Sequence, residues 1–246
     1  MYPVICKLGP FTIYSYGLMI VLAFIIATFL LTRRAKRQGL DPELIFNLSF
    51  LIIISGIIGA RALYLVLNFE YYFNNPVEII MLTRGGLAWF GGLIFASASC
   101  VVYLRYKHLD VYRIFDLTVP YAALGQAIGR IGCFLNGCCY GKEVSRFGIY
   151  FPVHDAILIP TQLYSSLALL GIYIILRIRQ SRVYQKGEVF YLYLFLYSVW
   201  RFFIEFLRAD TQIFIFGLTL FQIFSIALFI LSSVLLIRVK RQQENR

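Results

Sequence analysis

Seven long apolar stretches limit the fold of this chain more strongly than any other feature of its sequence. Most contain about 20 residues, the length at which an α-helix crosses a bilayer core of roughly 30 Å. Because backbone polar groups must be satisfied internally within lipid, helices are the default structure for such runs. The sequence predicts an all-α, polytopic membrane bundle of about seven transmembrane helices, forming a single transmembrane domain over residues 1–246. The stretches are Phe11–Thr32, Leu44–Leu67, Gly86–Leu104, Ile114–Gly132, Leu158–Leu176, Val189–Phe206 and Gly217–Ile237.

The composition excludes other classes of protein. Hydrophobic residues make up 60% of the 246 residues and charged residues only 14%, whereas an ordinary soluble domain is about 45–50% apolar and about 25% charged. With a mean hydropathy of +0.77, a soluble enzyme, a disordered chain and a fibrous repeat are excluded. The N-terminal sequence MYPVICKLGP does not resemble a secretory signal peptide, so we interpret the first apolar stretch as a membrane span.

Most of the 23 lysines and arginines lie on one side of a seven-span arrangement. The positive-inside rule makes that side cytoplasmic, which places the N-terminus outside and the C-terminus in the cytoplasm. The net charge of +11 is thereby explained without a nucleic-acid partner. The basic clusters are Arg33, Arg34, Lys36 and Arg37; Arg105, Lys107 and Arg113; Arg177, Arg179, Arg182 and Lys186; and Arg238, Lys240, Arg241 and Arg246.

Five charged residues lie within the apolar stretches or at their ends, namely Arg61, Asp116, Arg130, Arg201 and Glu205. Such residues usually face the interior of a bundle and mark a functional path, although side chains near helix ends can also extend to the interface. Arg201 and Glu205 are four residues apart and can pair on one helix face, which leaves a purely structural ion pair open. Arg130 and Arg201 both lie toward the outer ends of their spans. Because arginine suits bidentate phosphate recognition, we expect a site for an anionic phospholipid.

Glycines are also patterned. Gly125 and Gly129 form a small-xxx-small pair, which lets two helices approach closely. Further glycines after Arg130 suggest irregular backbone at the membrane edge, which is tolerated only where it is packed in protein or lines a cavity.

The stretch GRIGCFLNGCCYGK, residues 129–142, resembles the signature of the bacterial prolipoprotein diacylglyceryl transferases. Other segments resemble motifs of the same family in the same order, so the resemblance covers nearly the whole chain. They are SYGLMI (Ser15–Ile20), GARALY (Gly59–Tyr64), GGLAWFGGLI (Gly85–Ile94), PTQLY (Pro160–Tyr164) and WRFFIEFLR (Trp200–Arg208).

The resemblance implies an enzyme of the bacterial cytoplasmic (inner) membrane. It would transfer the diacylglyceryl group of phosphatidylglycerol to the lipobox cysteine thiol of a prolipoprotein signal peptide, forming a thioether and releasing glycerol phosphate. No cofactor and no metal are implied. A transporter or a non-catalytic lipid-binding protein is the alternative from another class, but we see no internal repeat of the kind found in transporters.

The resemblance also assigns residues. It makes Arg130 the phosphate ligand, Arg201 a second cationic contact and Glu205 the group that orients Arg201, and these three are the expected catalytic residues. The substrate-binding set, besides Arg130, consists of Tyr16 for polar donor groups, Asn136 and Gly141 in the signature loop, Asp116 as a structural or orienting carboxylate, and Arg61 on the second span.

Some positions depart from the family pattern. Phe90 stands where relatives often have a histidine, so the general base is unassigned. Cys133 replaces a common asparagine, Cys138 replaces a common glutamate, and Ser165 follows PTQLY where glutamate is usual.

Three of the five cysteines, Cys133, Cys138 and Cys139, fall within seven residues. A metal site, a disulfide on the outer face and plain loop packing are the alternatives. Because a zinc site takes four ligands and His154 is the only histidine nearby in sequence, we favour loop packing over a metal site.

Overall fold

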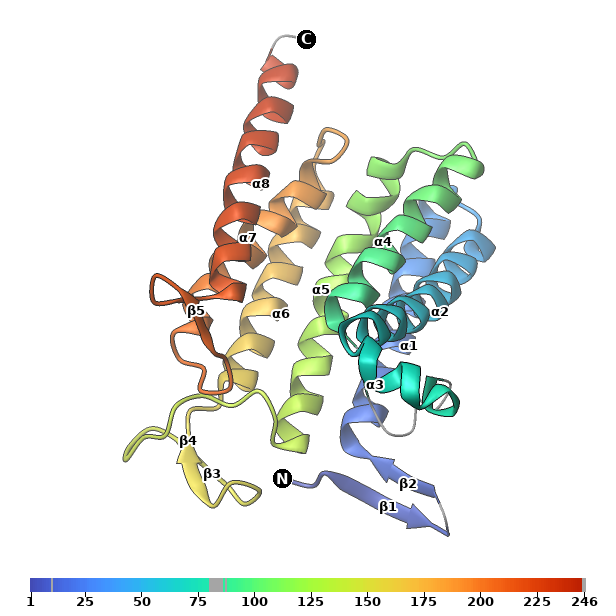
Figure 1. The fold of residues 1–246 in the computed structure, drawn as a ribbon. Coiled ribbons are helices and arrows are strands. Elements are labelled where there is room, and N and C mark those ends of the chain that lie inside the picture. Colours follow the sequence, from blue (N-terminus) through green and yellow to red (C-terminus); the bar gives the residue numbers. More distant parts are fainter. Residues whose placement is uncertain (10, 80–85, 87, 245–246) are drawn as a thin grey trace. The chain divides into compact units, whose positions relative to one another are not determined.

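The structure is a computed structural model that describes residues 1–9, 11–79, 86 and 88–244. It is mostly helical, as predicted (Figure 1). The long helices are α1 (Ser15–Arg37), α2 (Pro42–Leu67), α4 (Trp89–Tyr106), α5 (Val111–Asn136), α6 (Thr161–Gln180), α7 (Glu188–Glu205) and α8 (Leu220–Glu244). The short helices are α3 (Phe69–Asn74) and η1 (Pro76–Ile79). The strands are β1 (Val4–Leu8), β2 (Phe11–Tyr14), β3 (Ile149–Phe151), β4 (Ala156–Leu158), β5 (Ile213–Ile215) and β6 (Leu218–Thr219).

Within the described residues, five helices are both long and apolar enough to cross a membrane: α1, α2, α4, α6 and α8. The helices α5 and α7 carry four of the five charges that the sequence analysis singled out. Asp116 and Arg130 lie on α5, and Arg201 and Glu205 lie on α7, which also carries Glu188. The fifth, Arg61, lies on α2. The two long helices outside the set of five are therefore the ones that hold the candidate site.

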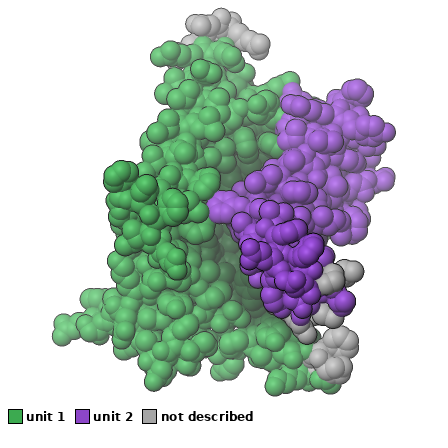
Figure 2. All heavy atoms as spheres, viewed as in Figure 1, with its two compact units in different colours: residues 1–31, 112–246 green, residues 32–111 purple. Residues whose placement is uncertain are grey.

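The described chain divides into two compact units, coloured separately in Figure 2. Unit 1 comprises residues 1–31 and 112–246, and unit 2 comprises residues 32–111. The interpretation of the whole chain as a single transmembrane domain remains a prediction.

The core of unit 1 lies among α5, α6 and α7. Each of these helices runs antiparallel to the one before it in the chain (Figure 1). Two hydrogen bonds between helices fix their register. The Ser166 hydroxyl on α6 donates to the carbonyl of Ala127 on α5 over 2.9 Å, and the Gln126 amide on α5 donates to the Tyr193 hydroxyl on α7 over 2.7 Å. The buried apolar residues of this core are Val119, Ala123, Ala127, Leu169, Ile172, Leu176, Val189 and Tyr193.

The first part of α1 packs against the glycines of α5. A Cβ atom placed at Gly132 would lie 2.9 Å from the Cβ of Met19, which is closer than real contacts of this kind. At Gly125 and Gly129 the nearest side-chain atoms of α1 would lie at 3.6 and 3.5 Å. The close approach therefore depends on Gly132, whereas the predicted pair of Gly125 and Gly129 lies at ordinary van der Waals distances from α1.

Unit 2 is built on close packing of α2 against α4. A Cβ atom at Gly59 would lie 2.6 Å from the carbonyl oxygen of Gly91, and one at Gly92 would lie 3.1 Å from that of Gly56. The second and third motifs of the sequence therefore contain a helix-packing surface. Gly85 and Leu87, which also belong to the third motif, lie outside the described residues.

The apolar stretches and the helices differ at several of their ends. Phe11–Tyr14 forms strand β2 and pairs antiparallel with β1, and Leu158 ends strand β4, which pairs with β3. The last stretch begins in the β5–β6 hairpin, and α8 starts only at Leu220. Gly9 and Gly217, each with a positive φ, lie at the hairpin turns. Apolar composition does not distinguish a short strand from a helix end, which accounts for these differences.

Candidate active site at the ends of α5 and α7

The signature stretch ends α5 with a defined C-cap. Gly137 has φ +77°, a left-handed conformation that glycine adopts without steric cost. Its N–H donates to the carbonyl of Phe134 over 3.2 Å, and the N–H of Cys138 donates to the carbonyl of Cys133 over 3.1 Å. This pair of bonds is the Schellman motif, which satisfies the last carbonyls of the helix. It also turns the chain back so that Cys138 lies beside Cys133.

The first turn of α6 holds the loop that follows. The Gln162 amide donates to the carbonyl of Cys138, and the Thr161 hydroxyl donates to the carbonyl of Cys139, each over 2.7 Å. Both side chains are almost fully buried. The Gln162 Oε1 atom has no hydrogen-bond donor among the described residues. The PTQLY segment therefore holds the signature loop through these two hydrogen bonds.

Gly141 lies where an added side chain would clash with its neighbours. Its N–H donates to the carbonyl of Ile159 over 2.9 Å, and it forms a β-bridge with Arg208. An added Cβ atom would lie 2.7 Å from both the Ile159 Cβ and the Leu207 carbonyl oxygen. The predicted role of Gly141 in shaping the loop thus has a steric basis. The loop joins the end of α5 to the end of α7 through these contacts.

Arg130 lies about two turns before Gly137 and is half-buried. Within the part of the chain that the structure describes, its guanidinium makes no hydrogen bond and no ion pair. Its charge acts on Tyr16, Cys139 and Arg201. A half-buried cation without a partner is costly, so Arg130 is a candidate ligand for an anion.

Arg201 and Glu205 form an ion pair near the end of α7, with 2.9 Å between Nη2 and Oε2. Both are buried, at 9% and 3% exposure. The other carboxylate oxygen of Glu205 accepts a 2.9 Å hydrogen bond from the Thr219 hydroxyl, and the guanidinium carbon of Arg201 lies 4.5 Å from the centre of the Phe221 ring. Glu205 orients Arg201, and the residues around the start of α8 hold both groups.

Thr219 also begins α8. Its hydroxyl accepts from the N–H of Gln222 over 3.3 Å, while the Gln222 side chain accepts from the N–H of Thr219 over 2.9 Å. This reciprocal pair is a capping box. One threonine therefore fixes both the helix start and the carboxylate of Glu205.

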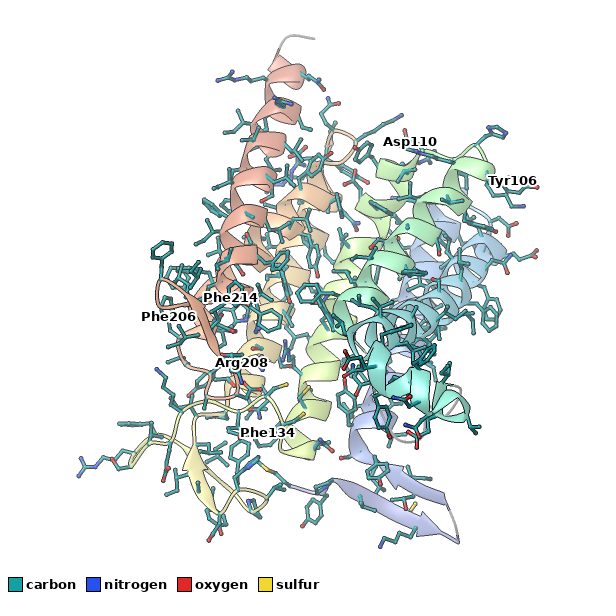
Figure 3. All side chains as sticks on the ribbon, in the orientation of Figure 1. Tyr106, Asp110, Phe134, Phe206, Arg208 and Phe214 are labelled. Atoms are coloured by element: carbon teal, nitrogen blue, oxygen red, sulfur yellow. The ribbon has the colours of Figure 1, made fainter. Side chains whose placement is uncertain are left out.

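Arg208 belongs to the same region, although the sequence analysis did not single it out. Labelled in Figure 3, it lies in the loop after α7, and its guanidinium binds both carboxylate oxygens of Asp210, at 2.8 and 2.6 Å. The signal was its place at the end of the WRFFIEFLR motif. Thr161 and Gln162 had the same kind of signal, because both lie in the PTQLY motif, whereas Thr219 lies outside every motif.

The sulfur atoms of Cys133, Cys138 and Cys139 all lie within 4.8 Å of one another, and the three are free thiols. Asn136 contacts the Cys138 thiol. Hydrogen bonds from the Cys133 and Cys138 thiols lower the pKa of Cys139, and the positive charges of Arg208 and Arg130 lower it further. Cationic surroundings thus favour a thiolate at this position.

Tyr16 lies in the first turn of α1 and is 42% exposed. One of its ring carbons would lie 3.5 Å from a Cβ atom at Gly132, which places the ring beside the end of α5. The structure thereby brings Tyr16, Asn136 and Gly141 together with Arg130, Arg201 and Glu205 in unit 1.

Asp116 lies away from these residues, about 20 Å from Arg130 along α5 at 1.5 Å per residue. Its fully buried carboxylate accepts hydrogen bonds from the backbone N–H groups of Gly187 and Phe190, at 2.6 and 2.8 Å. These donors belong to the start of α7. The geometry supports the structural role for Asp116 rather than contact with a ligand at Arg130.

Arg61 lies in unit 2 and is 7% exposed. Its guanidinium donates to the carbonyls of Glu78, Ile79 and Gly86, at 2.6, 3.0 and 3.1 Å. It also lies over the ring of Tyr72, 5.2 Å from the ring centre. These contacts tie η1 and Gly86 to α2, and they occupy N–H donors of the guanidinium.

Comparison with known proteins identifies the family. The family model described as "Prolipoprotein diacylglyceryl transferase" matches residues 3–238. The chain belongs to the prolipoprotein diacylglyceryl transferase family. The match includes every motif and every candidate residue described above.

Relatives in this family have similar lengths. The chain is 38% identical over 223 residues to the phosphatidylglycerol–prolipoprotein diacylglyceryl transferase of Clostridium tetani, covering 86% of this chain and 87% of the relative. It is 36% identical over 242 residues to the enzyme of the same name from Bacillus cytotoxicus, covering 94% and 89%. For that of Bacillus cereus the identity is 35% over 243 residues, with the same coverage.

Proposed function

We propose that this chain transfers the diacylglyceryl group of phosphatidylglycerol to the lipobox cysteine thiol of a prolipoprotein, forming a thioether and releasing glycerol phosphate. The observation that carries the proposal for the site is Arg130, a half-buried guanidinium with no hydrogen bond or ion pair to any described residue. By contrast, Arg61 and Arg208 bind backbone or carboxylate oxygens. The reaction is inferred from family membership, and Arg130 is the proposed binding site for the anionic donor lipid.

Arg130 binds the phosphate of the donor lipid in this proposal. Phosphate oxygens match the planar fork of a guanidinium. As the carbon–oxygen bond to the phosphate breaks, negative charge builds up on the departing glycerol phosphate. A fixed cation in a poorly hydrated site stabilises that charge more than it stabilises the intact lipid.

Arg201 is the second cationic contact. Glu205 holds one of its nitrogens, and its other N–H groups make no hydrogen bond with the described residues. Its charge interacts with that of Arg130, so an anion between them would relieve the repulsion. Tyr16, at the start of α1, would contact polar groups of the donor.

The nucleophile is the thiol of the acceptor peptide. Its sulfur forms a bond to the terminal glycerol carbon of the diacylglyceryl group while that carbon's bond to the phosphate oxygen breaks. The thiol proton leaves before or during this step, and the phosphate takes the bonding electrons. The cysteines of the chain itself have no covalent role in this reaction.

We further propose that all seven long helices span the bacterial cytoplasmic membrane, with α5 and α7 joining the five apolar helices. Their charged residues then face protein or the site rather than lipid. The basic clusters place the C-terminus in the cytoplasm and the N-terminus outside. In this orientation, Arg130 and Arg201 lie at the outer leaflet.

Incubation of the purified chain with labelled phosphatidylglycerol and a lipobox peptide tests the function. We expect a mass gain of one diacylglyceryl group on the peptide, together with release of glycerol phosphate. A matched peptide with serine in place of the lipobox cysteine serves as the control and should stay unmodified. A mass gain on the serine peptide, or label on the chain itself, would contradict the proposed reaction.

A further inference from the structure

Three sulfur atoms converge in unit 1 without a role in the proposed reaction. The Sγ atoms of Cys133, Cys138 and Cys139 lie within 4.8 Å of one another. Cys133 is buried at 8% exposure, while the other two are half-buried. A trio of thiols so close together, and partly accessible, is a potential set of soft ligands.

The backbone that presents these thiols is fixed at each residue. The Schellman motif of α5 places Cys138 beside Cys133. The carbonyls of Cys138 and Cys139 are held by Gln162 and Thr161. Cys139 adopts φ +62°, a left-handed conformation that costs free energy for a residue other than glycine. The surrounding structure therefore imposes the convergence.

We propose that Cys133, Cys138 and Cys139 form a three-thiolate site for one zinc-class metal ion, Zn²⁺ itself or a chemically similar ion such as Cd²⁺. Zinc–sulfur bonds of about 2.3 Å in a tetrahedral arrangement place the sulfurs roughly 3.8 Å apart. The observed upper limit of 4.8 Å is close enough for small side-chain rotations to complete the site. The proposal does not depend on the transfer reaction.

The charge around the site suits such a complex. Three thiolates and one divalent ion carry a net charge of −1. Arg208 and Arg130 both act electrostatically on Cys139. Because Arg208 is already paired with Asp210, Arg130 is the cation in position to balance the excess negative charge. Soft thiolate ligands also select zinc and related ions over magnesium or calcium.

The fourth ligand would come from outside the chain. His154, which the sequence placed nearest, is otherwise engaged: its Nε2 lies 2.8 Å from the Gly137 carbonyl and its ring centre lies 4.1 Å from that of Tyr140. Three protein ligands with one open position are typical of zinc sites that bind water or an added ligand. The sequence analysis favoured loop packing because a fourth protein ligand was lacking. In the proposed site, a water molecule or another external ligand takes the fourth position.

Metal binding by the purified full-length chain tests the site. After chelation and re-addition of Zn²⁺, we expect one zinc per chain by elemental analysis. Replacement by Co²⁺ should give a sulfur-to-cobalt charge-transfer band, which reports thiolate ligands directly. Cys133→Ser, Cys138→Ser and Cys139→Ser should each weaken Zn²⁺ binding by more than roughly 10–100-fold. That is the usual cost of losing a group that only hydrogen-bonds to a metal ligand.

Cys6→Ser and Cys100→Ser serve as matched controls, because their thiols lie outside the cluster, and they should retain full binding. Should a cluster variant fail to fold, the wild-type chain supplies a second measurement. Zn²⁺ should protect three thiols from maleimide, and a chelator should restore their labelling. Zinc bound equally by the triple serine variant, or no protection of these thiols, would overturn the proposal.

Discussion

The Asp116 carboxylate on α5 accepts a 2.6 Å hydrogen bond from the backbone N–H of Gly187, 71 residues further along the chain. It accepts a second, of 2.8 Å, from Phe190. An acidic group at the positive end of a helix is stabilising, and the two bonds satisfy N–H groups that the first turn of α7 leaves without intrahelical partners. A charge buried in an apolar stretch thus acts as the N-terminal anchor of the helix that carries Arg201.

Asp116→Asn is expected to destabilise the fold while sparing the chemistry. The amide keeps one acceptor but turns an NH₂ group toward a backbone donor, which costs about 1–3 kcal/mol for the unsatisfied pair. Denaturant unfolding in detergent would measure the loss, and turnover per folded molecule should remain near wild type. Asp41→Asn is the matched control: Asp41 caps α2 at an exposed position through a 2.9 Å bond, where asparagine caps equally well. An equal loss in both variants would argue against the anchoring role.

Arg130→Lys is expected to lose most of its turnover while folding and inserting normally. Lysine keeps the charge but not the planar fork that binds two phosphate oxygens. Loss of one such donor typically lowers kcat by about 10²–10³. Diacylglyceryl transfer to a lipobox peptide by the monodisperse variant is the measurement. The same substitution at Arg113, at the other end of α5, should be nearly neutral. Near wild-type turnover at position 130 would reduce Arg130 to an interfacial anchor and make Arg201 the leading phosphate ligand.

Thr219→Val is expected to lower kcat by about 10-fold with little change in KM. A hydrogen bond to a charged group contributes about 1.5–3 kcal/mol, and here the bond holds Glu205 rather than substrate. Steady-state kinetics would separate the two constants. Thr219→Ser retains the hydroxyl and should recover most of the activity. If valine and serine variants behave alike, the hydroxyl has no positioning role.

Gly141→Ala is expected to destabilise the signature loop by about 1–3 kcal/mol, the usual cost of overpacking. The added methyl would meet the Leu207 carbonyl oxygen and the Ile159 Cβ at 2.7 Å. Gly171→Ala, within α6, adds the same methyl where nothing lies within 4 Å, and it should be neutral or stabilising by up to about 1 kcal/mol. Thermal unfolding of both variants would compare them directly. Equal midpoints would show that the loop adapts to the methyl group.

The sequence was most informative where a single local signal sufficed. Apolar length predicted the long helices, and the signature stretch with its glycines indicated the loop after Arg130. The i, i+4 spacing predicted the Arg201–Glu205 pair, which the structure confirms at 2.9 Å. Each of these depends on residues that are near one another in the chain.

Contacts between distant segments could not be predicted in the same way. The bonds from Thr161 and Gln162 to the cysteine carbonyls span 22 and 24 residues, and no periodicity records them. The strand ends of the apolar stretches were missed because hydropathy does not encode dihedral angles. The backbone partners of Arg61 could not be predicted for a related reason: the carbonyls of Glu78 and Ile79 lie 17 and 18 residues further along the chain, outside any sequence motif.

The hydrogen bond from Thr219 to Glu205 connects the start of α8 to the Arg201–Glu205 ion pair, a link that the apolar sequence of α8 does not indicate. Within its described span, α8 is among the most apolar helices of the chain, and a protein engineer would treat it as an exchangeable anchor. A chimera in which another hydrophobic segment replaces Thr219 and α8 would insert and remain soluble in detergent. It would nevertheless lose the Thr219 hydroxyl that holds Glu205, the ion-pair partner of Arg201. In the proposed mechanism, the Thr219 hydroxyl immediately before α8 links this helix to Arg201 through Glu205. A chain shortened or fused at this point should therefore keep Thr219.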